Sequence, residues 1–223
     1  MILYNKSWKK DRGNQNYSGA SAFTNPDAAY GKVALSSACF KQQIAHICMG
    51  GETTLTAEVD IIDKSKALEV AGWKQSSCAD GPGMRSVLFL QGCSMHCPGC
   101  HNKSAQKKGG GELWDICEIA GYIMQACHNK RLTISGGEPM EQWESLCELL
   151  AFLRDEGFDL CIYTGWGVSR MPREVFALVD YLKCGSFLSE LGSENIRYVG
   201  SGNQRMFRRF SGQWEELDLH MGV

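Results

Sequence analysis

The 223-residue sequence lacks several features that mark membrane and nucleic-acid-binding proteins. It has no apolar run close to the roughly 20 residues that cross a bilayer, and its first residues, MILYNKSWKKDRG, lack the apolar centre of a secretory signal. It also has no excess of positive charge, with 23 Lys and Arg against 25 Asp and Glu. We therefore expect a cytoplasmic protein that binds neither a membrane nor a nucleic acid.

Cysteine, in contrast, is abundant, with 11 residues in the chain. In a small secreted protein such a number would indicate disulfides, whereas in a reducing cytoplasm cysteines serve as metal ligands or buried thiols. Four cysteines on apolar faces of expected elements are interpreted as buried thiols: Cys117, Cys127, Cys147 and Cys161. A second metal site made by Cys39, Cys48 and Cys78 is an alternative for the scattered cysteines.

The chain divides near residue 66 into two regions of different character. Residues 1–66 are interpreted as a loop-rich N-terminal extension with one alternating segment, 54–61, that predicts a strand. In residues 67–223, short apolar runs alternate with segments of helical periodicity. The expected strands are 87–91, 131–135, 160–164 and 179–183, and the expected helices are 113–127 and 140–154.

Strands that alternate with helices indicate an α/β fold with a parallel sheet or a partial barrel. Ligands of such folds bind at the carboxyl ends of the strands. Three motifs follow three expected strands: a cysteine loop that starts at Gly92, Gly136-Gly-Glu-Pro139 and Thr164-Gly-Trp-Gly167. We expect them to share one rim, where the glycines leave room for a ligand and Glu138 offers a carboxylate to a cationic group.

The cysteine loop, GCSMHCPGCHN, has three cysteines within eight residues: Cys93, Cys97 and Cys100. Three thiols leave one position open in a site that needs four ligands. The residues alone allow two interpretations. One is a structural zinc site completed by His96 or His101, and the other is an iron–sulfur cluster with one iron open to a further ligand.

The spacing Cys93-x3-Cys97-x2-Cys100, followed by Gly136-Gly-Glu-Pro139, resembles the radical S-adenosylmethionine (SAM) superfamily. The stretches SCADGPGMR and CPGCHNKSA are similar to the small activating enzymes of glycyl-radical proteins. Near the end of the chain, YLKCGSF and GSGNQR resemble the anaerobic ribonucleotide reductase activating proteins. The resemblance covers residues 67–210. Gly99 stands where the superfamily usually has an aromatic residue, a difference that is normal in this subgroup.

The resemblance implies a partial parallel (β/α) barrel of the radical SAM type at 67–223, in which Cys93, Cys97 and Cys100 hold a [4Fe–4S] cluster. It implies that the methionine part of SAM lies on Gly136, Gly137 and Glu138. The backbone of Gly99, Cys100 and His101 would line the adenine, and Thr164 and Gly165 the ribose. No acid or base residue is required, because the cofactor supplies the reactive chemistry.

By the same resemblance, a one-electron donor such as a flavodoxin reduces the cluster, which cleaves SAM to a 5′-deoxyadenosyl radical. That radical takes a hydrogen from a glycine of an anaerobic (class III) ribonucleotide reductase. We expect the small residues of Asp80-Gly-Pro-Gly83 to keep open the approach for that glycine. Two alternatives are an activase of another glycyl-radical enzyme or a different radical SAM enzyme, and a zinc-binding interaction module.

Overall fold

A computed structural model describes residues 67–192 and 196–219, so the N-terminal extension and its expected strand at 54–61 lie outside the described residues. The strands are β1 (Ala67–Ser77), β2 (Arg85–Leu90), β3 (Glu112–Asp115), β4 (Arg131–Gly136), β5 (Asp159–Tyr163), β6 (Tyr181–Cys184), β7 (Arg205–Phe210) and β8 (Gln213–Glu216). The α-helices are α3 (Ile116–Ala126), α4 (Trp143–Asp155) and α5 (Val175–Leu178). None of the helices in these ranges is long and apolar enough to cross a bilayer.

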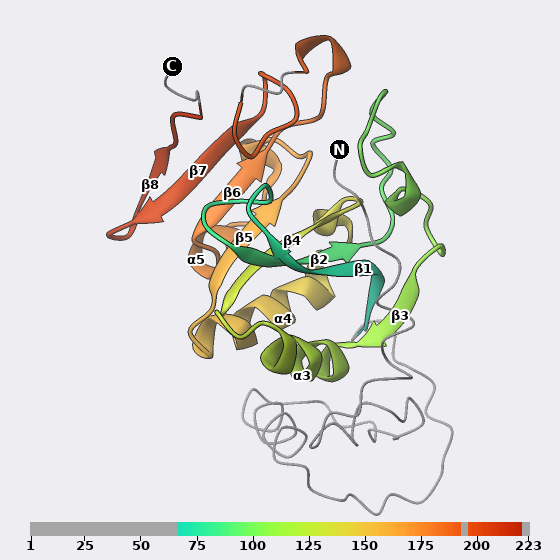
Figure 1. The fold of residues 1–223 in the computed structure, drawn as a ribbon, viewed down its shortest axis with the longest axis vertical. Helices are drawn as coiled ribbons and strands as arrows, with labels where there is room; N and C mark the ends of the chain where they lie inside the picture. The colour runs from blue at the N-terminus through green and yellow to red at the C-terminus, as the bar shows by residue number, and fades with distance from the viewer. Residues whose placement is uncertain (1–66, 193–195, 220–223) are drawn as a thin grey trace, which may run out of the picture.

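The strands form one eight-stranded sheet in the order β3-β1-β2-β4-β5-β6-β7-β8 (Figure 1). Its centre, β2-β4-β5-β6, is parallel, and this confirms the α/β class and the four strands expected from the sequence. Antiparallel strands extend the sheet on both sides, β1 and β3 beyond β2, and β7 and β8 beyond β6. The sheet is therefore mixed, and its closure into a partial barrel stays a prediction.

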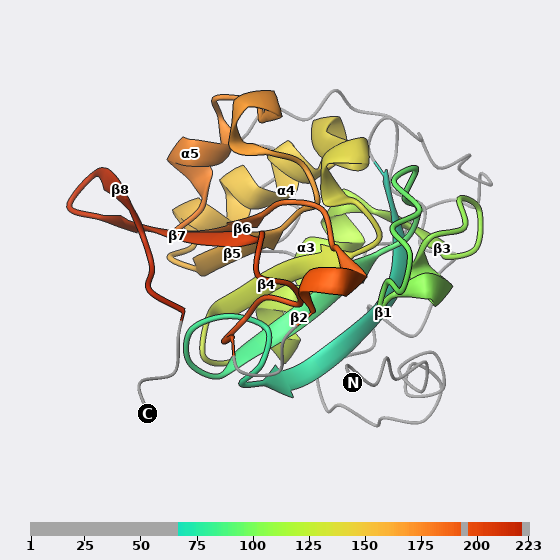
Figure 2. The same ribbon diagram turned by 90° about the horizontal axis from the view of Figure 1, so that it is seen from above.

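The core lies between the parallel strands and the helices α3 and α4, which pack beside each other. Figure 2 shows α4 and α5 together on one face of the sheet, above β5 and β6. β2 is buried along its whole length and lies between β1 and β4. Leucine and isoleucine side chains from strands and helices make up most of this core, among them Leu88, Leu132, Ile134, Ile119, Ile123, Leu146 and Leu150. The core thus fixes the relative positions of the strand ends that carry the three motifs.

The first expected helix, 113–127, begins three residues later than its spacing predicts. Leu113 lies in β3, where it pairs with Glu69 of β1, and its side chain is exposed. The helix begins at Ile116, because the Asp115 carboxylate accepts a 2.7 Å hydrogen bond from the N–H of Cys117 and forms a capping box. Strand pairing therefore overrides the helical spacing of Leu113.

The second expected helix, 140–154, begins instead at Trp143, after a 3₁₀ turn at Pro139–Gln142. Its buried face includes Leu146 and Leu150 as expected, but Trp143 and Cys147 are only half-buried. Of the four cysteines interpreted as buried thiols, Cys117, Cys127 and Cys161 are confirmed, and the interpretation of Cys147 is wrong.

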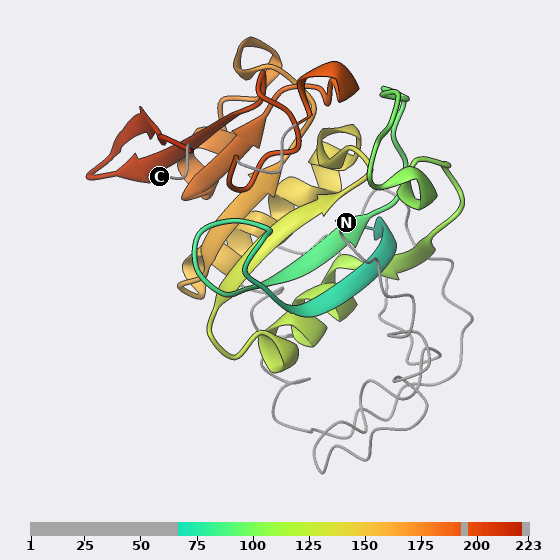
Figure 3. The ribbon, with the colours of Figure 1, turned by 45° about the horizontal axis from the view of Figure 1, so that its top comes forward.

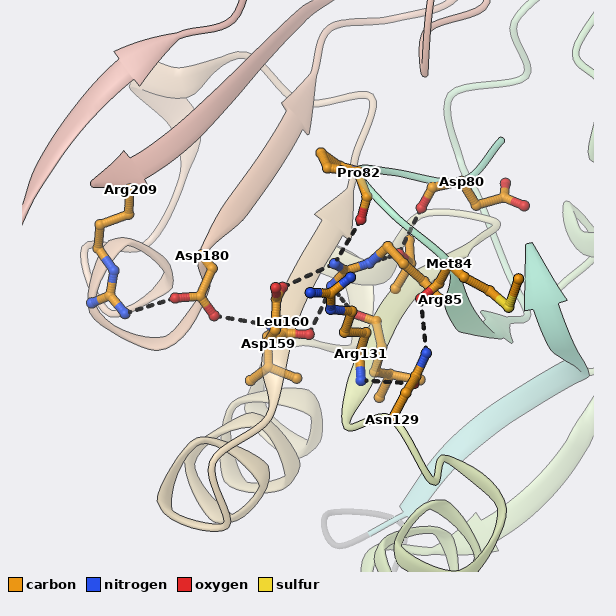
Figure 4. A network of polar contacts seen from close by, with 12 residues as sticks. Asp80, Pro82, Met84, Arg85, Asn129, Arg131, Asp159, Leu160, Asp180 and Arg209 are labelled. Atoms are coloured by element: carbon orange, nitrogen blue, oxygen red, sulfur yellow. Dashed lines mark hydrogen bonds and ion pairs between the residues drawn. The ribbon is translucent and has the colours of Figure 1, made fainter. Parts of the chain in front are cut away.

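Arg85, at the amino end of β2, holds the β1–β2 loop against β4 and β5 (Figure 4). The side chain is fully buried. Its Nε donates to the Thr133 hydroxyl at 2.9 Å, and its Nη1 donates to the Asp159 carboxylate at 2.9 Å and to the Pro82 carbonyl at 3.3 Å. The loop is therefore fixed to the amino ends of the neighbouring strands.

This position contradicts the expectation that Asp80-Gly-Pro-Gly83 opens an approach to the cysteine loop. The β1–β2 loop and the cysteine loop lie at opposite ends of β2, as Figure 3 shows. Asp80 is also completely buried and accepts hydrogen bonds from Ser77 and Lys74. The motif is a structural turn at the far end of the strand.

Candidate functional site

The cysteine loop leaves β2 at its carboxyl end and returns beside its own starting point. The N–H of Gly92 donates to the Ala105 carbonyl at 2.7 Å, and the N–H of Cys93 donates to the Gln106 carbonyl at 2.9 Å. A turn within the loop is marked by the 3.2 Å hydrogen bond from Cys100 N–H to the Cys97 carbonyl. Cys93, Cys97 and Cys100 are all free and half-buried, so one anchored loop presents three unpaired thiols.

Neither histidine of this loop joins the cysteines. Nδ1 of His96 lies 2.8 Å from the Ser94 carbonyl oxygen, and the ring of His101 packs against Phe187 with 5.0 Å between centroids. Within residues 67–192 and 196–219, no three Cys, His, Asp or Glu side chains are gathered closely enough to hold a metal ion. The structure therefore brings the three thiols onto one loop, but in the described ranges it gathers them into a ligand set for neither zinc nor a cluster.

The structure does not test the alternative second metal site, because it describes only one of the three cysteines. Cys78 is exposed in the β1–β2 loop, at the end of β2 opposite to Cys93. Cys39 and Cys48 lie outside the described residues.

The Gly136–Pro139 stretch lies directly against the strand end that leads into the cysteine loop. The N–H of Gly137 donates to the Leu90 carbonyl, and the N–H of Glu138 donates to the Gly92 carbonyl, both at 2.8 Å. A Cβ atom at Gly137 would lie 2.2 Å from the Gly92 oxygen. The sequence predicts that this glycine leaves room for a ligand, but the space is filled by the backbone that positions Cys93.

Glu138 connects the loop after β4 to the loop after β5. It is 1% exposed, and its carboxylate accepts hydrogen bonds from the Thr164 hydroxyl at 2.6 Å, the N–H of Gly165 at 2.8 Å and the N–H of Met140 at 3.0 Å. Burial raises the pKa of Glu138, while these three hydrogen bonds oppose the shift by favouring the charged form. The three residues expected at this rim, Glu138, Thr164 and Gly165, therefore lie in contact.

The Thr164 hydroxyl also accepts a 2.9 Å hydrogen bond from the N–H of Trp166, so its proton and one of its two acceptor positions are used within the protein. The remaining acceptor position leaves its place on the ribose side a prediction. Gly165 lies against the cysteine loop, since a Cβ atom at this position would be 2.5 Å from the sulfur of Met95. The Thr164–Gly165 stretch thus packs on the cysteine loop.

Several residues of the site were missed by the sequence reasoning. The Asn102 side chain donates to the Gly136 carbonyl at 3.1 Å, and Glu141 accepts from the N–H and hydroxyl of Ser94 and pairs with Lys108 at 2.8 Å. Asn102 and Ser94 lie within the quoted cysteine motif, so their place in the motif was a signal. No feature of the sequence pointed to Glu141, because its contacts form only in the folded chain.

Lys183 is a cation at the carboxyl end of β6 that the sequence reasoning also missed. Burial lowers the pKa of this lysine to about 8, although the charge of Glu138 opposes the shift. Its Nζ lies 5.4 Å from the centre of the Tyr163 ring. The N–H of Thr164 donates to the Lys183 carbonyl at 2.9 Å, so this lysine lies at the same rim.

Two comparisons with known proteins agree with this site. The family described as "4Fe-4S single cluster domain" matches residues 79–207, more than half of the chain, including all three cysteines of the loop. The anaerobic ribonucleoside-triphosphate reductase-activating protein of Salmonella typhi is 30% identical over 138 residues, which are 56% of this chain and 88% of the relative.

The proteins of the same name from Enterobacteria phage T4 and Escherichia coli K12 are each 28% identical. They match over 144 and 137 residues, which are 61% and 56% of this chain and 91% and 88% of the relatives. The chain therefore belongs to the 4Fe–4S single cluster domain family and, within it, is a homologue of the anaerobic ribonucleoside-triphosphate reductase-activating proteins.

Proposed function

We propose that this protein is an iron–sulfur activating enzyme that reductively cleaves SAM and generates a glycyl radical on an anaerobic ribonucleotide reductase. The observation that carries the proposal is the hydrogen bond from the N–H of Glu138 to the Gly92 carbonyl. It joins the Gly136–Pro139 stretch to the first residue of the cysteine loop. A site for the cluster and a site for SAM would thereby be built as one unit at one rim of the sheet.

Cys93, Cys97 and Cys100 would hold the cluster. Their chemistry fits, because thiolates are the ligands that iron–sulfur clusters take, and these three are unpaired and half-buried on one loop. Three cysteine ligands leave one iron open to a further ligand. When bound, the cluster supplies the electron that cleaves SAM to methionine and a 5′-deoxyadenosyl radical.

Glu138 would bind the amino group of the methionine part of SAM, beside Gly136 and Gly137. A carboxylate has about four acceptor positions, and the chain uses three of them at Glu138. The remaining position can accept from an ammonium group, and burial strengthens that interaction. Lys183 would supply the complementary charge for the carboxylate of the same methionine.

Gly99, Cys100 and His101 would line the adenine, and Gly165 the ribose, since both segments border the same rim. Thr164 would lie beside Gly165 on the ribose side and would also fix the carboxylate of Glu138. We further propose a one-electron donor such as a flavodoxin, and as the target a reductase whose glycine reaches the carboxyl end of the parallel strands. Near contact between the reacting atoms is required for the hydrogen transfer.

The test is anaerobic reconstitution of the full chain with iron and sulfide, followed by reduction with dithionite and addition of SAM. The proposal expects a brown protein that binds about four irons per chain, as a [4Fe–4S] cluster requires, and that releases 5′-deoxyadenosine. Cys97→Ala should form no cluster and release no 5′-deoxyadenosine. Cys147→Ala, which alters a half-buried thiol of α4, should form the cluster and release 5′-deoxyadenosine. A colourless protein that binds one zinc ion would refute the proposal.

A further inference from the structure

The GSGNQR stretch near the end of the chain is a turn that holds a second loop, Gly185 to Leu188, in place. The side-chain oxygen of Gln204 accepts hydrogen bonds from the N–H of Gly200 at 2.8 Å and of Ser201 at 3.2 Å, which closes the turn on itself. The amide nitrogen of Gln204 donates to the Gly185 carbonyl at 2.8 Å. One buried side chain thus shapes the turn and binds the loop after β6.

Two further contacts complete this attachment. The Asn203 side chain donates to the Ser186 carbonyl at 2.8 Å, and the N–H of Leu188 donates to the Ser201 hydroxyl at 3.2 Å. The backbone on both sides of Phe187 is therefore fixed by side chains of the turn. These contacts hold the backbone from which the Phe187 ring extends.

The Phe187 ring lies between the turn and the cysteine loop. On one side a Cβ atom at Gly200 would be 3.1 Å from Cδ2 of the ring, so the glycine lets the ring lie against the backbone. On the other side the ring packs against His101 with 5.0 Å between centroids, and a Cβ atom at Gly99 would lie 3.4 Å from its Cε1. Gly99 has a φ of +74°, a conformation that favours glycine.

We propose that Phe187 is a positioning residue for the turn that carries Cys97 and Cys100, and that Gln204 and Asn203 hold Phe187 against it. This inference rests on the proposed function, in which those cysteines hold the cluster. Within the turn the chain forms a backbone hydrogen bond from Cys100 to Cys97, and Pro98 and Gly99 are exposed. An external contact is what keeps two of the three ligands in register, as outer contacts do in other metal sites.

The experiment compares Phe187→Leu with Phe187→Tyr, which retains the ring, and with Phe176→Leu. Phe176 is a half-buried phenylalanine on α5 that packs against Trp214, so it controls for the loss of an aromatic ring elsewhere. The readouts on the reconstituted protein are the rate of iron loss to a chelator and the electron paramagnetic resonance (EPR) spectrum of the reduced cluster before and after SAM.

We expect Phe187→Leu to lose iron faster by up to about tenfold, the change that about 1.4 kcal/mol of lost aromatic contact gives. Its EPR spectrum should be altered, while Phe187→Tyr and Phe176→Leu match the unaltered protein. Gln204→Ala should reproduce the effect of Phe187→Leu, and the double variant should lose iron no faster than the worse single variant, because both act through one contact.

If Phe187→Leu keeps the iron-loss rate and spectrum of the unaltered protein, the inference is wrong. Equal losses in Phe187→Leu and Phe176→Leu would also refute it, because the effect would then be one of general stability. If Gln204→Ala does not fold, Asn203→Ala replaces it in the comparison of the single and double variants. An unaltered protein that forms no cluster would instead refute the proposed function, and the two failures are therefore distinguishable.

Discussion

The Thr164 hydroxyl donates a 2.6 Å hydrogen bond to the carboxylate of Glu138, and both side chains are almost completely buried. This bond joins the ends of two neighbouring parallel strands, β4 and β5. Since the carboxylate also accepts from the N–H of Gly165, its two oxygens are held in fixed directions. A carboxylate that is fixed before its ligand arrives loses little entropy on binding it.

Glu138→Gln should therefore weaken SAM binding without loss of iron. An amide has one acceptor oxygen, so the side chain of this variant cannot accept from both Thr164 and Gly165 as the carboxylate does. We expect the Kd for SAM to rise about tenfold or more, as for a lost hydrogen bond to a charged group. Glu144→Gln, an exposed position at the start of α4, is the matched control. An unchanged Kd in Glu138→Gln would mean that the carboxylate does not contact SAM.

Gly137→Ala should disturb the cysteine loop itself. The new methyl group would lie 2.2 Å from the Gly92 oxygen and 2.7 Å from the Ala105 oxygen, and backbone on both sides cannot move away cheaply. We expect a lower iron content after reconstitution and a lower melting temperature. Gly167→Ala is the control, because a Cβ atom there meets nothing within 4 Å. Full iron content in Gly137→Ala would contradict the contact.

Replacement of Cys93, Cys97 or Cys100 by alanine should abolish the cluster and SAM cleavage, because iron would lose one of its thiolate ligands. Cys117→Ala should keep both, at a cost of about 1 kcal/mol of folding stability for a small buried thiol. Iron content and the absorbance of the reconstituted proteins measure the presence of the cluster. A complete cluster in Cys97→Ala would overturn the ligand assignment.

The parallel centre of the sheet was predictable from the sequence because its strands are short apolar runs, such as Val87 to Leu90, that are typical of buried strands. β1 and β7 were missed, because polar residues such as Lys74 in the one and Arg208 in the other interrupt their apolar pattern. These strands form through antiparallel contacts with partner strands. Leu113 was misassigned for a similar reason, because its partner Glu69 lies far earlier in the chain.

The residues of the candidate site also divide into those that a local motif predicts and those that only the folded chain brings together. The three cysteines and Glu138 were predictable, because each lies in a short motif at the end of a recognisable strand. The role of Gly137 was not, because the atoms that exclude a side chain there belong to Gly92 and Ala105. Lys183 and Phe187 were also missed as parts of the site. The one lies in β6 and the other just after it, and only the folded sheet brings them near the cysteine loop.

Arg85→Met should destabilise the fold strongly, although Arg85 lies at the end of β2 opposite to the cysteine loop. The change leaves the Thr133 hydroxyl and the carbonyls of Leu132 and Asp159 without this donor in a buried place. We expect a loss of about 3 kcal/mol in the free energy of unfolding, measured with a denaturant. Arg208→Met, which removes an exposed pair with Glu215, should leave that free energy unchanged within error. Equal losses would contradict the role of Arg85.

The most direct test of the whole account is EPR on the reconstituted protein mixed with the anaerobic ribonucleotide reductase of the same genome, SAM and dithionite. The account predicts a glycyl-radical signal on the reductase that requires SAM and disappears with Cys97→Ala. A protein that carries its cluster and cleaves SAM, yet never produces that signal, would contradict the assignment of this chain as an activating enzyme for the reductase.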